Sequence, residues 1–371
     1  MVLSKKFKQA ILQVHLWLGL ATGLIVFIVS ITGCLYVFEK EIRDFTEQEY
    51  LYVPVQHKAF IGLATIIETY EKLAPKGKMG TIRITNDQPN ATVSIGNKKK
   101  MYYFNPYTGA LVKKTSADWL DTVEDLHRTL LLGDVGEFIM HWSVVIFVLM
   151  LISGWILWFP SQMRLLRQSL TIKWKASFKR VNYDLHNVLG FYASWILIII
   201  AMSGLYFAFD GVKAAGAFLT GTKVSKPLRV KGDNAGPIVT GKTRAVRYDQ
   251  FFSSFNQQYP GANTVTISQR KDGDMRLRMV YPARGIRQQN IFYFDPATAR
   301  LKSYKLSKDY TTADKLDATN YDIHTGQFLG LFGKIMAFIA ALISASLPVT
   351  GLIIWLKKKK KSRKKLSPVK A

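Results

Sequence analysis

Cysteine is almost absent from this 371-residue chain, since Cys34 is the single one. An intrachain disulfide and a metal site built from several cysteines are therefore excluded. Acidic residues are also scarce: 25 Asp and Glu compare with 51 Lys and Arg, for a formal net charge of +26. Such an excess indicates nucleic acid or a membrane surface as a partner, and the positions of the charges decide between them. If the chain binds a metal, histidine must supply the ligands.

Four long segments lack Asp, Glu, Lys and Arg altogether. Each has 22 or 23 residues, and a helix needs about 20 to cross a hydrocarbon core of about 30 Å. The sequence therefore predicts four transmembrane helices. No small-x-small cleavage site precedes the charged exit of the first one, so we expect it to be an uncleaved anchor. The four segments are Leu16–Phe38, Phe138–Pro160, Val188–Phe209 and Ile335–Leu356.

Basic residues are concentrated in the short segments that flank these helices. The N-terminus, the loop 161–187 and the tail 357–371 together carry 18 Lys or Arg and one acid, Asp184. The positive-inside rule places these segments, and with them both termini, in the cytoplasm. Beside a membrane exit, the basic tail indicates lipid headgroups rather than nucleic acid as its partner. The long segments 39–137 and 210–334 are then expected outside.

Each long outer segment has one helical pattern followed by alternating, β-branched stretches. The pattern predicts helices at about 61–73 and 245–258 and strands at 80–85, 91–95, 264–268 and 275–280. Asn105-Pro106 and Asp295-Pro296 predict turns. The fold class is therefore a membrane α-helical protein with two small α+β modules on the outer side.

The two halves of the chain share one spacing of histidine, glycine and tryptophan. His15 and His186 are each followed by glycines at the same two offsets, which are Gly19 and Gly33 in the first half and Gly190 and Gly204 in the second. His127 and His324 are each followed by glycines and a tryptophan at matching offsets, which are Gly133, Gly136, Gly154 and Trp158, then Gly330, Gly333, Gly351 and Trp355. We therefore expect two parallel repeats of helix, outer module and helix, related by a pseudo-twofold axis along the membrane normal.

The four repeated histidines are the candidate site residues. By topology, His15 and His186 lie at the cytoplasmic ends of their helices, and His127 and His324 lie just outside the outer ends. Ionisable groups at a membrane boundary are functional candidates. Two imidazoles without a nearby carboxylate or thiolate make a poor zinc site. They suit haem, because the porphyrin leaves only the two axial positions of the iron to the protein.

Gly19 and Gly190 lie one turn after the inner histidines, on the same helical face. A missing side chain there leaves room for the haem macrocycle. The alternative is close packing of two helices through small residues.

His141 is an alternative outer ligand. It lies inside the second apolar segment, and the shift in sequence that relates His127 to His324 places Phe338 at its equivalent position. Symmetry therefore favours His127, and His141 could instead line the haem pocket. His57, far from any apolar segment, is expected to be a surface residue.

Four motifs carry a family resemblance: 15–19 (HLWLG), 126–133 (LHRTLLLG), 184–190 (DLHNVLG) and 324–330 (HTGQFLG). They resemble the PepSY-associated transmembrane family, which includes iron-regulated bacterial inner-membrane proteins and ferric-siderophore reductases of the ferrioxamine reductase type. The resemblance covers nearly the whole chain. It implies PepSY-like outer modules, two b-type haems held by His15, His186, His127 and His324, and a place in the inner membrane.

The expected function is therefore that of an oxidoreductase that passes electrons outward to a ferric siderophore. A cytoplasmic reductase or a quinol would supply the electrons, and reduction releases the iron because Fe(II) binds hard oxygen ligands more weakly than Fe(III) does. No catalytic acid, base or nucleophile is expected. Two alternatives remain open: a haem-free sensor or anchor whose modules bind peptides or proteases, and a dihaem reductase of copper, flavin or a respiratory partner.

Overall fold

The computed structural model describes residues 4–75, 79–160, 162–230, 241, 243–270, 272–298 and 300–366. It divides into two compact units, which are described separately below. We call the first the membrane unit (Met1–Glu39, Thr122–Lys213 and Asn320–Ala371) and the second the sheet unit (Lys40–Asp121 and Ala214–Thr319).

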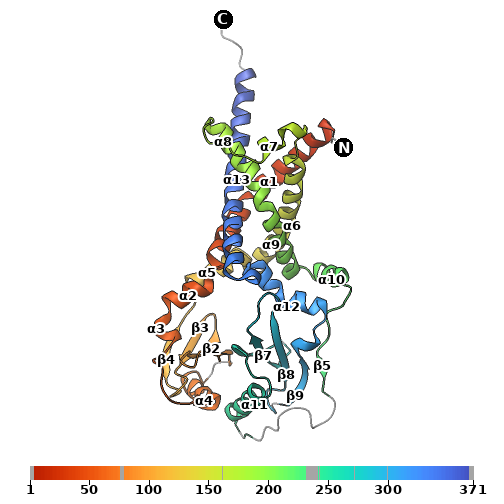
Figure 1. The fold of residues 1–371 in the computed structure, drawn as a ribbon. Coiled ribbons are helices and arrows are strands. Elements are labelled where there is room, and N and C mark those ends of the chain that lie inside the picture. The colour runs from red at the N-terminus through yellow and green to blue at the C-terminus, as the bar shows by residue number, and fades with distance from the viewer. Residues whose placement is uncertain are drawn as a thin grey trace. The chain divides into compact units, whose positions relative to one another are not determined.

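The membrane unit is built on four helices that run side by side (Figure 1). Their bounds are α1 (Lys5–Tyr36), α6 (Gly133–Trp158), α9 (Gly190–Ala208) and α13 (Gly330–Leu366). The third span also includes α8 (Phe178–Asp184) and the π-helical turn η2 (Leu185–Leu189). All four spans are long and apolar enough to cross a membrane, which confirms the predicted transmembrane helices.

The helices extend beyond the apolar segments that predicted them. Ser4 caps α1, because its hydroxyl accepts a hydrogen bond from the backbone N–H of Phe7 at 3.2 Å. At the other end of the chain, α13 continues through the basic residues to Leu366, so most of the predicted tail is helical. Residues 367–371 of that tail lie outside the described part of the chain.

Small and hydroxyl side chains allow these helices to pack closely. A buried cluster links α6, α9 and α13 through Leu151, Leu197 and three alanines, Ala193, Ala201 and Ala340. The Ser30 hydroxyl of α1 donates a hydrogen bond to the Ser344 hydroxyl of α13 at 2.9 Å. Each polar group thus finds a partner where lipid offers none.

Short helices connect the longer elements. They are α2 (Glu39–Thr46), α3 (Gln48–Leu51), α5 (Trp119–Thr129), η1 (Met163–Leu165), α7 (Leu166–Ser169), α10 (Asp210–Leu219), η3 (Ser307–Asp309), α12 (Thr312–His324) and η4 (Gln327–Leu329).

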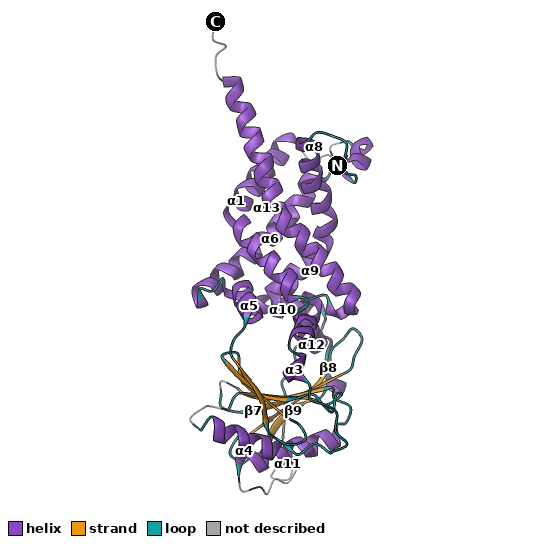
Figure 2. Ribbon diagram, turned by 90° about the vertical axis from the view of Figure 1, so that its left-hand side faces the viewer, coloured by secondary structure: helices purple, strands orange, loops and turns teal. Residues whose placement is uncertain are grey.

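The sheet unit contains one nine-stranded antiparallel sheet, in the order β4-β3-β2-β1-β6-β7-β8-β9-β5. Two helices, α4 (Leu63–Leu73) and α11 (Arg244–Gln258), cover one face of it (Figure 2). Apolar side chains from both helices and from alternate strand positions form the core between them. The strands are β1 (Thr81–Thr85), β2 (Val93–Asn97), β3 (Lys100–Phe104), β4 (Leu111–Thr115), β5 (Leu228–Arg229), β6 (Thr264–Gln269), β7 (Met275–Tyr281), β8 (Gln288–Phe294) and β9 (Leu301–Lys305).

The two long segments that were expected outside the membrane share this one sheet instead of forming separate modules. β1 of the first segment pairs with β6 of the second, with Ile82 opposite Ile267. In separate modules both strands would be edges with unpaired backbone groups, and their pairing removes those edges. The individual elements lie where the sequence predicted them, since α4, α11, β1, β2, β6 and β7 match the expected helices and strands within three residues.

Candidate functional site

The four repeated histidines form two pairs within the membrane unit. His15 on α1 faces His186 in η2, with 6.5 Å between the ring centroids and 88° between the ring planes. His127 near the end of α5 faces His324 at the end of α12, with 6.3 Å and 73°. We call these the inner pair and the outer pair.

The ring separations can be compared with those of imidazoles on opposite sides of one metal ion. With metal–nitrogen distances of about 2.0 to 2.1 Å, two such imidazoles have centroids about 6.3 Å apart. The 6.5 Å and 6.3 Å found in the two pairs are close to this value. Both pairs therefore have the spacing that two axial ligands of one iron require.

A hydroxyl group holds the Nδ1 atom of each histidine. The four hydroxyls come from one helix each, α1, α6, α9 and α13, and every one directly precedes a glycine of the repeat. The contacts are Ser153 to His15 at 2.8 Å, Thr32 to His127 at 3.0 Å, Thr350 to His186 at 2.9 Å and Ser203 to His324 at 2.9 Å. Each long helix thus carries one Ser/Thr-Gly dipeptide, and the hydroxyl of that dipeptide contacts the Nδ1 atom of one histidine.

These contacts determine the tautomer of the outer pair. His127 Nδ1 also lies 3.0 Å from the Val29 carbonyl, and His324 Nδ1 lies 3.1 Å from the Ile200 carbonyl. A carbonyl oxygen can only accept, so Nδ1 must carry the proton and Nε2 must have a free lone pair. Such a bond to Nδ1 is typical of metal-binding histidines, because it orients the ring and raises the basicity of Nε2.

The same tautomer follows for the inner pair. The Ser153 hydroxyl donates to the Met150 carbonyl at 3.0 Å, and the Thr350 hydroxyl donates to the Ser346 carbonyl at 2.9 Å. Because each hydroxyl donates its only proton to a backbone carbonyl, its oxygen can only accept a hydrogen bond from the histidine Nδ1–H group. All four imidazoles are therefore prepared to bind through Nε2.

The glycine of each dipeptide leaves space for the imidazole ring. A Cβ atom on the glycine would lie 3.2 to 3.7 Å from Cε1 of the histidine that the dipeptide receives, and at Gly351 and Gly33 the contact would be tight at 3.2 and 3.3 Å. This explains the last glycine that follows each histidine in the repeat. The contacts are Gly33 with His127, Gly154 with His15, Gly204 with His324 and Gly351 with His186.

Four other repeated glycines shape the turns after the outer histidines. Gly133 and Gly330 have φ of 57° and 64°, a region that favours glycine. A Cβ on Gly136 or Gly333 would lie only 1.6 or 2.0 Å from a backbone carbonyl oxygen of the preceding turn. The repeated interval between each outer histidine and these glycines is therefore explained by the tight turn that leads from the short helix into the long helix.

The inner histidine His186 lies in the π-helical turn η2. Such turns insert one extra residue into a helix and occur often at functional sites. Asn182, one turn earlier, donates a hydrogen bond to the backbone carbonyl of Thr350 at 3.1 Å. Asn320 does the same for Ser203 at 3.0 Å, one turn before His324. Asn182 thus fixes the backbone of Thr350, whose hydroxyl contacts His186. Asn320 fixes the backbone of Ser203 in the same way, and the hydroxyl of Ser203 contacts His324.

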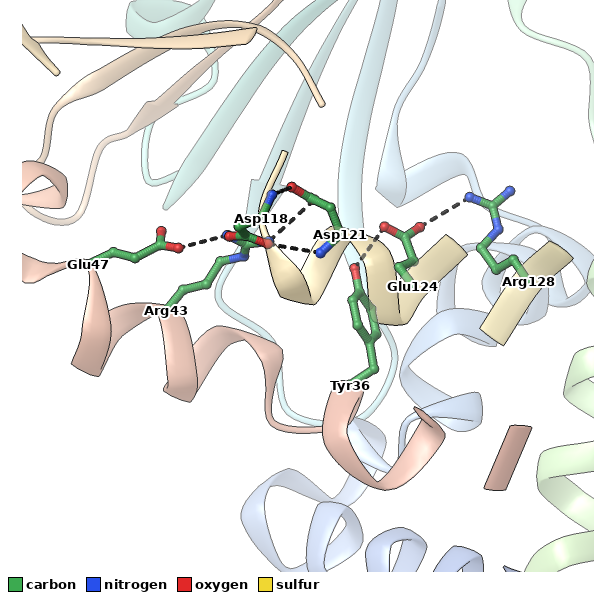
Figure 3. A network of polar contacts seen from close by, with 7 residues as sticks. All are labelled: Tyr36, Arg43, Glu47, Asp118, Asp121, Glu124 and Arg128. Atoms are coloured by element: carbon green, nitrogen blue, oxygen red, sulfur yellow. Dashed lines mark hydrogen bonds and ion pairs between the residues drawn. The ribbon is translucent and has the colours of Figure 1, made fainter. Parts of the chain in front are cut away.

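Helix α5, which carries His127, is held by charged side chains at its start and its middle (Figure 3). In the sheet unit, Arg43 binds Asp118 at 2.5 Å and Glu47 at 2.8 Å, and the Asp118 carboxylate caps α5 by accepting from the backbone N–H of Asp121 at 2.9 Å. In the membrane unit, Glu124 accepts a hydrogen bond at 3.1 Å from the Tyr36 hydroxyl at the end of α1.

Helix α12, which carries His324, begins at a comparable cluster in the sheet unit. The buried Asp314 carboxylate binds the Lys305 ammonium at 2.6 Å and the Ser225 hydroxyl at 2.7 Å. Burial raises the pKa of Asp314, but the hydrogen bonds from Lys305, Ser225 and Thr311 outweigh it and lower the pKa to about 2. The carboxylate is therefore ionised, and it fixes the first turn of the helix.

The surroundings of the outer pair favour the neutral form of both imidazoles. Burial, followed by the neighbouring His324, lowers the pKa of His127 to about 4, and burial also lowers the pKa of His324. The neutral form is the one that binds metal. Val29, whose carbonyl accepts a hydrogen bond from His127, also lines an apolar groove between α1 and α6. The groove is lined by Ile25, Val26, Val29, Ser30, Met140, Ser143, Val144 and Phe147.

The other predicted site residues lie apart from the pairs. His141 contacts Phe209, with 5.6 Å between ring centroids, and Glu137 at 3.7 Å, and it faces no second histidine. The exposed His57 lies in the sheet unit. A Cβ on Gly19 would meet Met150 at 3.0 Å, and one on Gly190 would meet Leu347 at 3.4 Å, so both glycines provide helix packing in this structure. Their predicted role beside a macrocycle stays a prediction.

Across the described residues, no group of three or more His, Cys, Asp or Glu side chains could hold a metal ion. The repeat of histidine, glycine and tryptophan that predicted the site did not include the four hydroxyl residues. Their signal was present, because Ser or Thr precedes the glycine at each of the four repeated positions.

The family model described as the PepSY-associated TM region matches residues 12–358. The chain belongs to this family. No curated protein matches the chain. The PepSY-associated TM region includes both histidine pairs and all four Ser/Thr-Gly dipeptides, so the match covers every part of the candidate site.

Proposed function

We propose that this chain binds two b-type haems, one at each histidine pair, and passes electrons across the inner membrane to a ferric siderophore on the periplasmic side. The observation that carries the proposal is the geometry of the two pairs, with ring centroids 6.5 and 6.3 Å apart. Each haem would supply one-electron redox chemistry at its iron.

The protein's own residues would bind and orient these groups. The four imidazoles would hold the two haems, and the dipeptide hydroxyls accept hydrogen bonds from the Nδ1–H groups and so leave each Nε2 free to bind. The apolar groove beside the outer pair would exclude water from the edge of a macrocycle. No sequence motif for covalent haem attachment is present, so binding would be non-covalent.

The direction of electron flow follows from charge. The basic loop 161–187 and the basic tail favour a cytoplasmic position for the inner pair. The outer pair stands on α5 and α12, two helices that begin in the sheet unit. A donor would therefore meet the inner pair and an acceptor the outer pair.

Haem content is the first test. A pyridine haemochrome assay on the purified protein should give two haem b per chain. A haem-free protein would refute the proposal and favour a sensor or anchor, and one haem per chain would refute the two-pair version.

The second test addresses the acceptor. With the protein pre-reduced in oriented vesicles, ferric siderophore added on the side of the sheet unit should reoxidise the haem quickly. The same addition on the opposite side should be slow. Equal rates from both sides would contradict the direction, and no reoxidation from either side would point to another acceptor, such as copper, flavin or a respiratory partner.

A further inference from the structure

The sheet has a strongly basic face. Helices α4 and α11 pack against one face, where Ile82, Val265 and Leu277 belong to the core. The alternate residues of the same strands point to the opposite face. On the central strands β1 and β7, that opposite face carries three arginines: Arg83, Arg276 and Arg278.

The strand register brings these arginines together. Arg83 is opposite Thr266 of β6, and Thr266 is opposite Arg278 of β7. Arg276 lies two residues from Arg278, opposite Ser268 and Tyr293 in the adjacent row. The first row crosses eight strands and consists of Lys113, Tyr103, Ser94, Arg83, Thr266, Arg278, Ile291 and Lys305.

Acidic partners neutralise the ends of this row but not its centre. Lys113 pairs with Glu49 at 3.3 Å, and Lys305 pairs with Asp314 at 2.6 Å. The three central arginines have no carboxylate within ion-pair distance among the residues that the structure describes. The Nε atom of Arg278 is buried and has no hydrogen-bond partner there.

Three arginine side chains on adjacent positions of one sheet face repel one another electrostatically when no anion is bound. Burial, together with the charges of Arg276, Arg287 and Arg83, lowers the pKa of Arg278 to about 10. The guanidinium nevertheless stays protonated at neutral pH, because even this pKa is far above 7. A bound oxyanion would reduce the repulsion and give the Nε–H group of Arg278 an acceptor.

The structure assigns to this face a binding site for a small anion that carries several carboxylate groups. The backbones of Arg83 and Arg278 are two strands apart, a distance of about 10 Å. The backbones of Arg276 and Arg278 are about 7 Å apart along one strand. Three guanidinium groups distributed over such a triangle match a tricarboxylate, which can present one carboxylate group to each arginine. The hydroxyls of Thr266 and Ser268 lie on the same face between them.

Under the proposed function, the occupant would be a ferric chelate of the polycarboxylate class, and only this last step rests on that function. The binding site itself does not depend on haem. The two ideas can therefore fail separately.

The experiment measures citrate binding to the full-length protein in detergent by calorimetry at low salt. We expect saturable binding that weakens as salt is added. Arg278→Gln should weaken it about tenfold or more, as expected for the loss of a charged hydrogen-bonding group. Arg83→Gln should also weaken it, and because Arg83 is exposed, this variant does not depend on core packing. Arg167→Gln, an equal charge change in the membrane unit, is the matched control.

Two results would overturn the site: no saturable citrate binding by the unmodified protein, or equal citrate affinity in Arg83→Gln and the unmodified protein. Inorganic phosphate binding as tightly as citrate would overturn the assignment to a ligand with several groups. Haem content is measured on the same preparations. Protein with two haems but no citrate binding would refute this inference alone, and haem-free protein that binds citrate would refute the proposed function alone.

Discussion

At the scale of single residues, each histidine depends on one Ser/Thr-Gly dipeptide. Histidine variants test the pairing directly. His15→Ala and His186→Ala should each remove the same haem, and His127→Ala and His324→Ala should each remove the other, because one axial ligand holds a b-type haem poorly. Haem content and the spectrum of the remaining haem are the measurements. His141→Ala, the control, should leave two haems, and loss of the outer haem in His141→Ala but not in His127→Ala would assign the ligand to His141.

The hydroxyl groups should tune the two sites unequally. In the inner pair the hydrogen bond from His15 Nδ1 goes to Ser153, whereas His127 Nδ1 has both Thr32 and the Val29 carbonyl. A donated Nδ1–H bond makes the ring a stronger ligand and favours the ferric state. Ser153→Ala should therefore raise the potential of its haem more than Thr32→Val raises that of the other.

A redox titration that resolves the two haems measures this difference. Ser153→Thr is the control, because it keeps the hydroxyl and matches the residues at the Thr32 and Thr350 positions. Equal shifts in Ser153→Ala and Thr32→Val would contradict the role given to the Val29 carbonyl.

At the scale of elements, local sequence patterns predicted most of the fold. Apolar segments predicted the four spans, and amphipathic patterns predicted α4 and α11. The pairing of β1 with β6 was not predicted, because it joins residues from the two halves of the chain and no local pattern specifies it. The π-helical turn at His186 was missed for a similar reason: ordinary helical periodicity describes α8 and α9 equally well.

The candidate site shows the same limit. The repeated spacing selected the four histidines, but it did not indicate which glycines contact them. Gly19 and Gly190 are near His15 and His186 in sequence, yet their Cβ positions face Met150 and Leu347. Contacts between helices determine the neighbours of each ring, and the sequence alone does not contain those distances.

Helix α12 provides a prediction at this scale. Asp314 has a folded-state pKa of about 2, below its ordinary value of 3.8, so its contribution to stability is complete above about pH 4 and is lost as the pH falls toward 2. The shift corresponds to about 2 kcal/mol. Asp314→Asn should lower the thermal unfolding midpoint at pH 7, and the difference from the unmodified protein should shrink as the pH falls below 4.

Thermal unfolding in detergent at several pH values measures this effect. Asp309→Asn, at an exposed position shortly before α12, is the control and should leave the midpoint unchanged. An Asp314→Asn protein with an unaltered midpoint at pH 7 would show that the ion pair with Lys305 contributes little.

At the scale of the whole molecule, the two histidine pairs are separated along the membrane unit. His15 lies on the continuous helix α1, and so does Thr32, which receives His127. At about 1.5 Å per residue, the interval between them is about 25 Å, most of a hydrocarbon core of about 30 Å. His186 and Ser203, which receives His324, are separated by the same interval in sequence. The two pairs are thus separated by most of the thickness of a bilayer core, which is the separation that the proposed electron transfer across the membrane would require.

The side on which each pair lies depends on the orientation of the chain, and cysteine labelling tests it. Cys34 is buried and is the single cysteine, so a Cys34→Ala background accepts new reporters. An impermeant thiol reagent should label Lys58→Cys, in the sheet unit, in intact spheroplasts. It should label Lys175→Cys, in the basic loop, only after the membrane is permeabilised, because the positive-inside rule places that loop in the cytoplasm. Both positions are exposed, so access to the reagent depends on the side of the membrane. The reverse pattern would place the outer pair on the cytoplasmic side and reverse the proposed electron flow, and labelling of both positions in intact spheroplasts would contradict the predicted topology.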